Sequence, residues 1–81
     1  MHVHNVLRRE NMETKFYTQR HSEINGRNVW LYLIVCPLGY IYFVEYEKKT
    51  LELEKFYFGA CEEKAEKKYN SICSKMIKGT I

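Results

Sequence analysis

The sequence has 81 residues and a formal net charge of +3, from 13 Lys and Arg against 10 acidic residues, all of which are Glu. A chain of this length has room for one domain with a small core. The mild positive charge argues against a mimic of nucleic acid, which needs a strongly negative surface. The lack of Asp argues against a metal-dependent nuclease, because Asp is a common Mg²⁺ ligand at phosphoryl-transfer sites.

Residues 1–12 show no clear hydrophobic period, and we expect them to form a flexible N-terminal arm of a single domain that spans residues 1–81. The arm carries the basic pair Arg8 and Arg9. The sequence leaves open whether translation starts at Met1 or at Met12.

The segment from Thr14 to His21 alternates in polarity, which predicts a half-exposed strand, and Asn25-Gly26 after it is the typical signal of a type I′ hairpin. Such a turn would pair Ile24 with Arg27. Continued along the hairpin, this register places His21, Trp30, Gln19, Tyr32 and Tyr17 on one face and Leu31, Leu33, Val35 and Phe16 on the other.

An uncharged run of 17 residues, Asn28 to Val44, is interrupted by Pro37-Leu38-Gly39. The run approaches the length of a membrane span, but the central Pro and Gly favour two strands folded back on each other, and we expect no membrane insertion. The first of these strands is apolar on both faces, which is typical of a strand covered on one side and either covered or used for contact on the other. The sequence does not determine the register of the second strand, Tyr40 to Tyr46.

The segment Leu51 to Phe58 alternates in polarity and predicts a short fourth strand at an edge, with a helical extension as the alternative. From Ala60 to Lys78 the period becomes that of an amphipathic helix, with Gly79 as its stop. The predicted fold is therefore α+β: a three- or four-stranded antiparallel meander with one C-terminal helix on one face. The predicted apolar stripe of this helix is Cys61, Ala65, Tyr69, Ile72, Cys73, Met76 and Ile77.

The residue pattern indicates no active site and no cofactor. The spacing of Cys61 and Cys73 and that of His2 and His4 do not suit a metal site, and no nucleophile motif or phosphate-binding glycine loop is present. Three Cys without a C-x-x-C pair, and no signal peptide, favour a reduced, cytoplasmic protein. We therefore expect a non-enzymatic protein without a metal.

The aromatic residues suggest that the protein binds a macromolecule, because Trp, Tyr and Arg are enriched at the energetic centres of interfaces. The simpler interpretation is that these rings pack inside the domain. A third interpretation is a homodimer whose interface buries these rings. The expected partner is another protein or a ribonucleoprotein, and the candidate binding residues are Trp30, Tyr32, Tyr17, Arg20, Arg27 and Tyr46.

The alternative function is binding of DNA or RNA by the same sheet, since aromatic side chains on an open sheet can stack with bases. Gly26, Trp30 and Tyr32 in the second strand, followed by a Phe58 and Glu-rich helix entry, resemble the arm-site DNA-binding modules of tyrosine recombinases. This resemblance implies a small sheet that binds DNA. The candidate residues for contact with nucleic acid are Arg8, Arg9, Arg20, Arg27, Lys64, Lys67 and Lys68.

The small size and the aromatic surface are also similar in style to the compact inhibitors that phages and mobile elements direct against host defence systems, such as anti-CRISPR proteins. We therefore expect that the protein inhibits a host protein or defence complex by occupying it.

Overall fold

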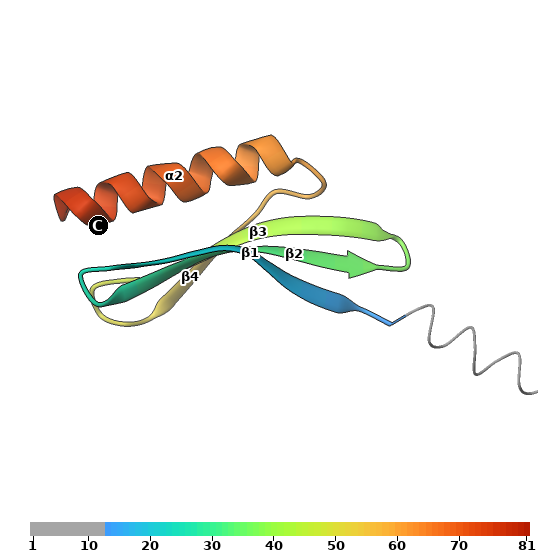
Figure 1. Ribbon diagram of the computed structural model, residues 1–81, viewed down its shortest axis with the longest axis horizontal. Coiled ribbons are helices and arrows are strands. Elements are labelled where there is room, and N and C mark those ends of the chain that lie inside the picture. The colour runs from blue at the N-terminus through green and yellow to red at the C-terminus, as the bar shows by residue number, and fades with distance from the viewer. Residues whose placement is uncertain (1–12) are drawn as a thin grey trace, which may run out of the picture.

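The computed structural model describes residues 13–81, so the predicted N-terminal arm with Arg8 and Arg9 lies outside the described residues. One antiparallel sheet contains the strands in chain order, followed by a helix (Figure 1). The predicted α+β fold is confirmed, and the fourth segment is a strand. The elements are β1 (Lys15–Ile24), β2 (Arg27–Cys36), β3 (Gly39–Glu47), β4 (Leu53–Tyr57) and α2 (Glu62–Lys78).

The turn between β1 and β2 is formed by Asn25 and Gly26, as predicted. Both residues have a positive φ, 53° for Asn25 and 79° for Gly26, which a type I′ turn requires. The first pair after the turn is Ile24 with Arg27 and the fourth is His21 with Trp30, so the predicted register is confirmed next to the turn.

We expect Gly26→Ala to destabilise the protein by about 1 kcal/mol, because an L-residue with a Cβ is strained at positive φ. Gly26→Asn is the matched control and should cost less, since Asn tolerates this region better than Ala. Urea unfolding of the three proteins measures the difference. Equal stability of the Ala and Asn variants would show that backbone strain at this turn does not contribute.

Further from the turn the predicted register is wrong, because β1 contains a bulge between Thr18 and Arg20. The extra residue shifts the pairing, so that Thr18 faces Tyr32 and Tyr17 faces Leu33. A bulge places two residues of one strand opposite one residue of its partner. As a result Tyr17 lies on the same face as Leu33, and Phe16 lies on the face of Tyr32, the reverse of the prediction.

The turn between β2 and β3 contains only Pro37 and Leu38, because Cys36 pairs with Gly39. This fixes the register that the sequence left open. Trp30 lies opposite Glu45, and Tyr32 lies opposite Phe43. The tyrosines of β3 (Tyr40, Tyr42 and Tyr46) therefore all lie on the other face from Trp30.

The core lies between α2 and one face of the sheet. Helix α2 begins after Cys61 and ends at Gly79, whose φ of 78° is left-handed. The predicted apolar stripe is confirmed at its centre. The assignment of Ile77 to this stripe is wrong, since its side chain is 68% exposed and faces away from the sheet. The side chains buried in this core are Val29, Leu31, Tyr42, Val44, Tyr46, Ala65, Tyr69, Ile72 and Met76.

Helix α2 covers only part of the sheet. The chain leaves β4 beside Tyr42, whose backbone N–H donates to Gly59, and α2 then runs back towards the β1–β2 turn, where the Asn25 side chain donates to Met76. The end of the sheet with the Pro37–Leu38 turn extends beyond the helix (Figure 1). Exposed apolar side chains gather there, namely Phe16, Tyr17, Val35, Leu38, Tyr40 and Ile41.

Candidate partner-binding face

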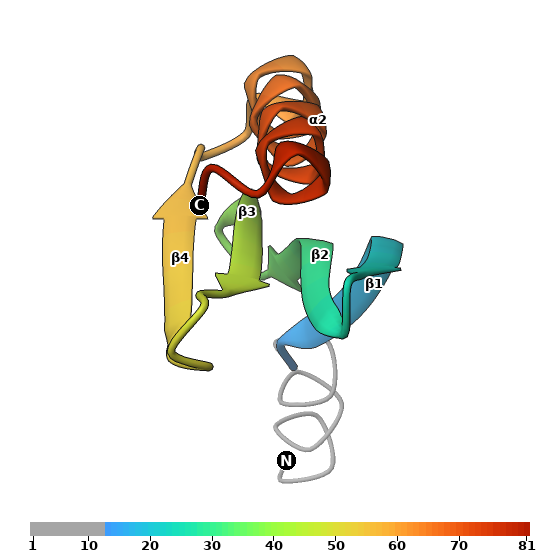
Figure 2. The ribbon, with the colours of Figure 1, turned by 90° about the vertical axis from the view of Figure 1, so that its left-hand side faces the viewer.

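The side of the sheet that faces away from α2 is here called the open face (α2 is seen nearly end-on in Figure 2, on one side of the sheet). It carries a continuous row of rings. Adjacent ring centroids lie 5.7 Å apart for His21 and Trp30, 6.1 Å for Trp30 and Tyr32, and 4.9 Å for Tyr32 and Phe43. Tyr57 on β4 completes the row, 5.3 Å from Phe43. We call these five residues the aromatic row; they connect all four strands.

The rings of the aromatic row support one another. The first three contacts are between nearly parallel, offset rings, with interplanar angles of 15°, 18° and 28°. Phe43 at the centre is only 6% exposed, whereas Tyr57 at the edge is 62% exposed. Trp30 and Tyr32 are half-buried. The row is therefore held in place by contacts within the domain.

Hydrogen bonds fix the His21 end of the row. Asn28 donates from its backbone N and from Nδ2 to Oε1 of Glu47, at 2.7 and 3.0 Å. Because Nδ2 is the donor there, Oδ1 of Asn28 accepts, and Nε2 of His21 at 2.8 Å must carry the proton. This chain of contacts orients the imidazole ring that stacks on Trp30.

A carboxylate lies in the middle of the open face. Glu45 is paired with Trp30 on one side and with Lys55 on the other, and it is only 8% exposed. The nearest cation is Nζ of Lys55, 4.0 Å from Oε2 of Glu45. Burial, together with the charge of Glu45, raises the pKa of Tyr32. The open face thus combines aromatic rings with an acidic group.

The predicted partner-binding residues are divided between the two faces. Trp30 and Tyr32 lie on the open face, together as predicted. Tyr17 lies on the opposite face because of the bulge. Tyr46 is buried under α2, and its hydroxyl donates to Oε1 of Glu54 at 2.7 Å. The open face therefore retains Trp30 and Tyr32 of the four predicted aromatic residues.

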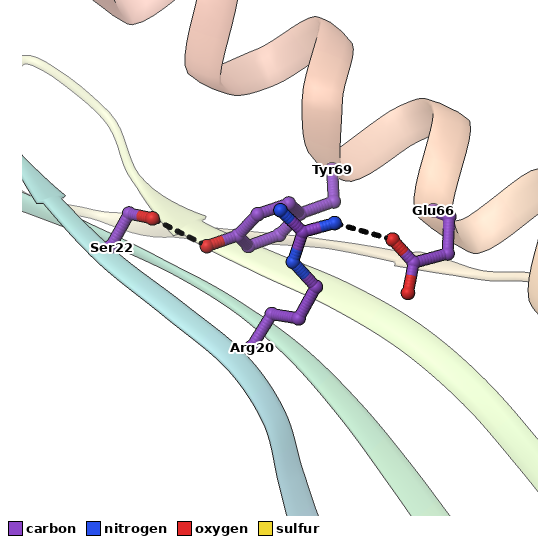
Figure 3. A network of polar contacts seen from close by, with 4 residues as sticks. All are labelled: Arg20, Ser22, Glu66 and Tyr69. Carbon is purple, nitrogen blue, oxygen red and sulfur yellow. Dashed lines mark hydrogen bonds and ion pairs between the residues drawn. The ribbon is translucent and has the colours of Figure 1, made fainter.

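Arg20 connects β1 to α2 (Figure 3). Its Nη1 donates to Oε1 of Glu66 at 2.6 Å, and its guanidinium lies 4.6 Å from the centroid of the Tyr69 ring. The Tyr69 hydroxyl in turn lies 2.6 Å from the Ser22 hydroxyl. The hydrogen bond to Glu66 raises the pKa of Arg20. These contacts hold the edge strand against the helix and keep Arg20 away from the aromatic row.

Arg27 is also on the side of α2. Its guanidinium donates to the backbone carbonyl oxygens of Glu47, at 3.3 Å, and of Ile81, at 2.6 Å. It contacts the segment that follows the helix and does not lie beside the aromatic row.

The three predicted helix lysines belong to α2 and so lie across the sheet from Trp30. Lys67 pairs with Glu63 at 3.9 Å, and Nζ of Lys68 lies 4.2 Å from the centroid of the Phe56 ring. Lys64 is exposed. The described basic residues of the nucleic-acid alternative therefore do not share a face with the aromatic row.

Sequence reasoning did not identify four residues of the open face, Phe43, Tyr57, Glu45 and Lys55. All four depend on the registers of β3 and β4. Had the turn after Cys36 been assigned two residues, the pairing of Tyr32 with Phe43 would have followed by counting along the strands. The alternation in β4 would then have placed Lys55 and Tyr57 on the same face.

The surface formed by residues 13–81 has no pocket. Over the same range, no group of three or more His, Cys, Asp or Glu side chains is placed to hold a metal ion. None of the helices in the described part of the chain is long and apolar enough to span a membrane. No protein-family model, curated protein or solved structure matches this sequence.

Proposed function

We propose that this chain is a small, non-enzymatic binding protein that acts by occupying the surface of another protein with its open face. The observation that carries the proposal is the aromatic row, which lies on a face of the sheet that no described element packs against. Trp and Tyr are the residues that most often dominate the binding free energy of protein interfaces.

The packing of the row supports this proposal. Binding normally costs conformational entropy, because interface side chains must be fixed in one rotamer. Stacking between Trp30 and Tyr32, and between Tyr32 and Phe43, already restricts these rings in the free protein. Binding of a partner to the row therefore costs less conformational entropy than binding to mobile side chains would.

The charges on the open face favour a protein over a nucleic acid as the partner. Binding to a phosphate backbone requires Lys or Arg beside the stacking rings. Here Arg20 and Arg27 contact groups on the side of α2. Lys55 lies beside the rings but is opposed by Glu45, and Glu47 adds a second carboxylate to this face. The carboxylates would repel phosphates.

Inhibition of a host protein or defence complex, in the manner of inhibitors from phages and mobile elements, is the biological role that we propose for this binding. Occupying a partner's surface requires affinity and no catalytic residues. The compact open face is suited to that mechanism.

The proposal is tested by capture of host proteins on the tagged full-length chain, with and without nuclease, followed by measurement of the affinity of the captured protein for variants. Trp30→Ala should weaken binding by about 30-fold or more, the loss expected at the energetic centre of an interface. Ile77→Ala is the matched control, because this exposed helix residue points away from the sheet, and its affinity should be unchanged.

Equal affinity of folded Trp30→Ala and wild-type protein for the captured partner would refute the proposal. So would recovery of nucleic acid, with proteins lost after nuclease treatment. A mass of two chains in light scattering that returns to one chain in Trp30→Ala would show that the partner is a second copy.

A further inference from the structure

Glu45 is an unusual residue for the middle of an aromatic face. It is 8% exposed as a residue, its side chain keeps 11% of its surface accessible to water, and the cation that the structure places beside its carboxylate is Lys55. Within residues 13–81 no fully buried side-chain oxygen or nitrogen lacks a partner, so the carboxylate of Glu45 still reaches water. Burial of a carboxylate costs free energy unless the charge is paired and hydrogen-bonded. Glu45 lies directly opposite Trp30 of β2 on one side and Lys55 of β4 on the other. Its carboxylate is therefore accessible at the surface of the open face and has room for a further cation.

Lys55 provides only a loose counter-charge. Its Nζ lies 4.0 Å from Oε2 of Glu45, at the limit of an ion pair, and its side chain is 49% exposed. An ion pair at this distance with one partner half-exposed is weak and is screened by salt. The same Nζ lies 5.8 Å from the centroid of the Phe43 ring. Lys55 thus shows that a cation fits between this carboxylate and the rings, while it is held weakly enough to be displaced.

The charge of the open face is opposite to that of the whole chain. By strand alternation, the ionised side chains of the strands on this face are Glu23, Glu45 and Glu47 against Lys55. The chain as a whole has a formal charge of +3. The face is complementary to a positive group, and its rings add a second attraction, because a cation above an aromatic face is stabilised by the ring quadrupole.

We propose that the partner presents an arginine side chain to Glu45 and displaces Lys55 from it. This inference rests on the proposed function and names the chemistry of the partner. A guanidinium matches the site better than an ammonium, since it donates two parallel hydrogen bonds to a carboxylate and also stacks on rings such as Trp30 and Tyr32. The partner segment that meets the open face is therefore a basic one with an exposed arginine.

The test uses peptides as probes and Trp30 fluorescence as the readout, since Trp30 is the only Trp of the chain. An acetylated peptide of alternating Gly and Arg should change the emission and bind more tightly than its Lys counterpart, while a Gly-Glu peptide should not bind. Glu45→Gln should weaken binding of the Arg peptide about tenfold or more, the typical effect of losing a hydrogen-bonded charge pair. Lys55→Gln should strengthen it severalfold, because the competing cation is gone.

Matched variants on α2 separate the site from a general charge effect. Glu63→Gln and Lys67→Gln make the same changes at an exposed pair on the other side of the sheet, and both should leave the affinity unchanged. If Glu63→Gln weakens binding as much as Glu45→Gln, or if the Lys peptide binds as tightly as the Arg peptide, the inference is overturned. The urea midpoints of the variants confirm that each is folded.

The result is separable from the proposed function. A captured partner that is lost with Trp30→Ala but binds Glu45→Gln at full affinity overturns only the arginine inference. A partner unaffected by Trp30→Ala refutes the proposed function itself. A single-stranded oligonucleotide that quenches Trp30 where the Arg peptide does not would overturn both.

Discussion

Leu31→Ala is expected to bring the protein to the margin of unfolding at room temperature. Leu31 is fully buried at the centre of β2, beneath α2. Removing a buried Leu side chain costs about 2–5 kcal/mol, because burial is lost and a cavity remains. A domain with a single core of this size has only about 3–5 kcal/mol of net stability. One substitution therefore removes most or all of the free energy of unfolding.

Leu38→Ala is the matched control for this prediction. Leu38 lies in the β2–β3 turn and is 99% exposed, so the same chemical change should alter the free energy of unfolding by less than about 0.5 kcal/mol. Urea unfolding followed by circular dichroism and by Trp30 fluorescence measures both variants. Similar midpoints for the two variants would show that the packing of α2 on β2 does not determine stability.

The protein is expected to lose stability steeply above about pH 10 because of Tyr46. Burial, then the hydrogen bond to Glu54 and the charge of Glu54, raise the pKa of Tyr46 to about 12, against a partly opposing effect of Arg27. A tyrosine in the unfolded chain ionises near 10. Between these two values the unfolded state releases a proton that the folded state retains, so stability is fully present below about pH 10 and falls as the pH rises to about 12.

Unfolding midpoints in urea between about pH 8 and pH 12 test this dependence. Tyr46→Phe should show a shallower decline over the upper part of the range, although it starts from a lower stability because the bond to Glu54 is lost. Tyr40→Phe makes the same change at an exposed tyrosine and should follow the wild type. Some decline will remain in Tyr46→Phe, since burial also raises the pKa of Tyr32 and Tyr69. Identical slopes for Tyr46→Phe and wild type would contradict the prediction.

The elements that could be predicted from sequence are those set by local signals. Asn25 and Gly26 specify a turn through their tolerance of positive φ, and the pairs next to that turn follow by counting. The helix follows from its period and from Gly79, which ends it in a left-handed conformation. Its last turn was less predictable: Ile77 continues the apolar pattern but faces away from the sheet.

The bulge in β1 could not be predicted, because nothing in the residues around Gln19 differs from a regular strand. A bulge depends on how a strand must twist to follow its neighbours, which is a property of the whole sheet. Its effect on the candidate site is direct, since it moves Tyr17 to the other face and brings Phe16 to the open face.

The candidate site was predicted only as far as the local register reached. Trp30 and Tyr32 are two residues apart on one strand, so they share a face in any pairing. Phe43 and Tyr57 join them only when both of the following turns are known. Glu45 was not identified for the same reason, and its burial among rings is a consequence of tertiary packing alone.

The half of β1 that lies away from the β1–β2 turn belongs to the surface and contributes no side chain to the core. Residues 15–19 are exposed on both faces, whereas the polar contacts of β1 with α2 come from Arg20 and from Ser22, nearer the turn. Insertion or deletion of one residue before Arg20 would exchange Phe16 and Tyr17 between the two sides and leave every core side chain in place. A change of one residue in the length of this segment can therefore alter which rings the surface displays, while the side chains that stabilise the fold keep their packing.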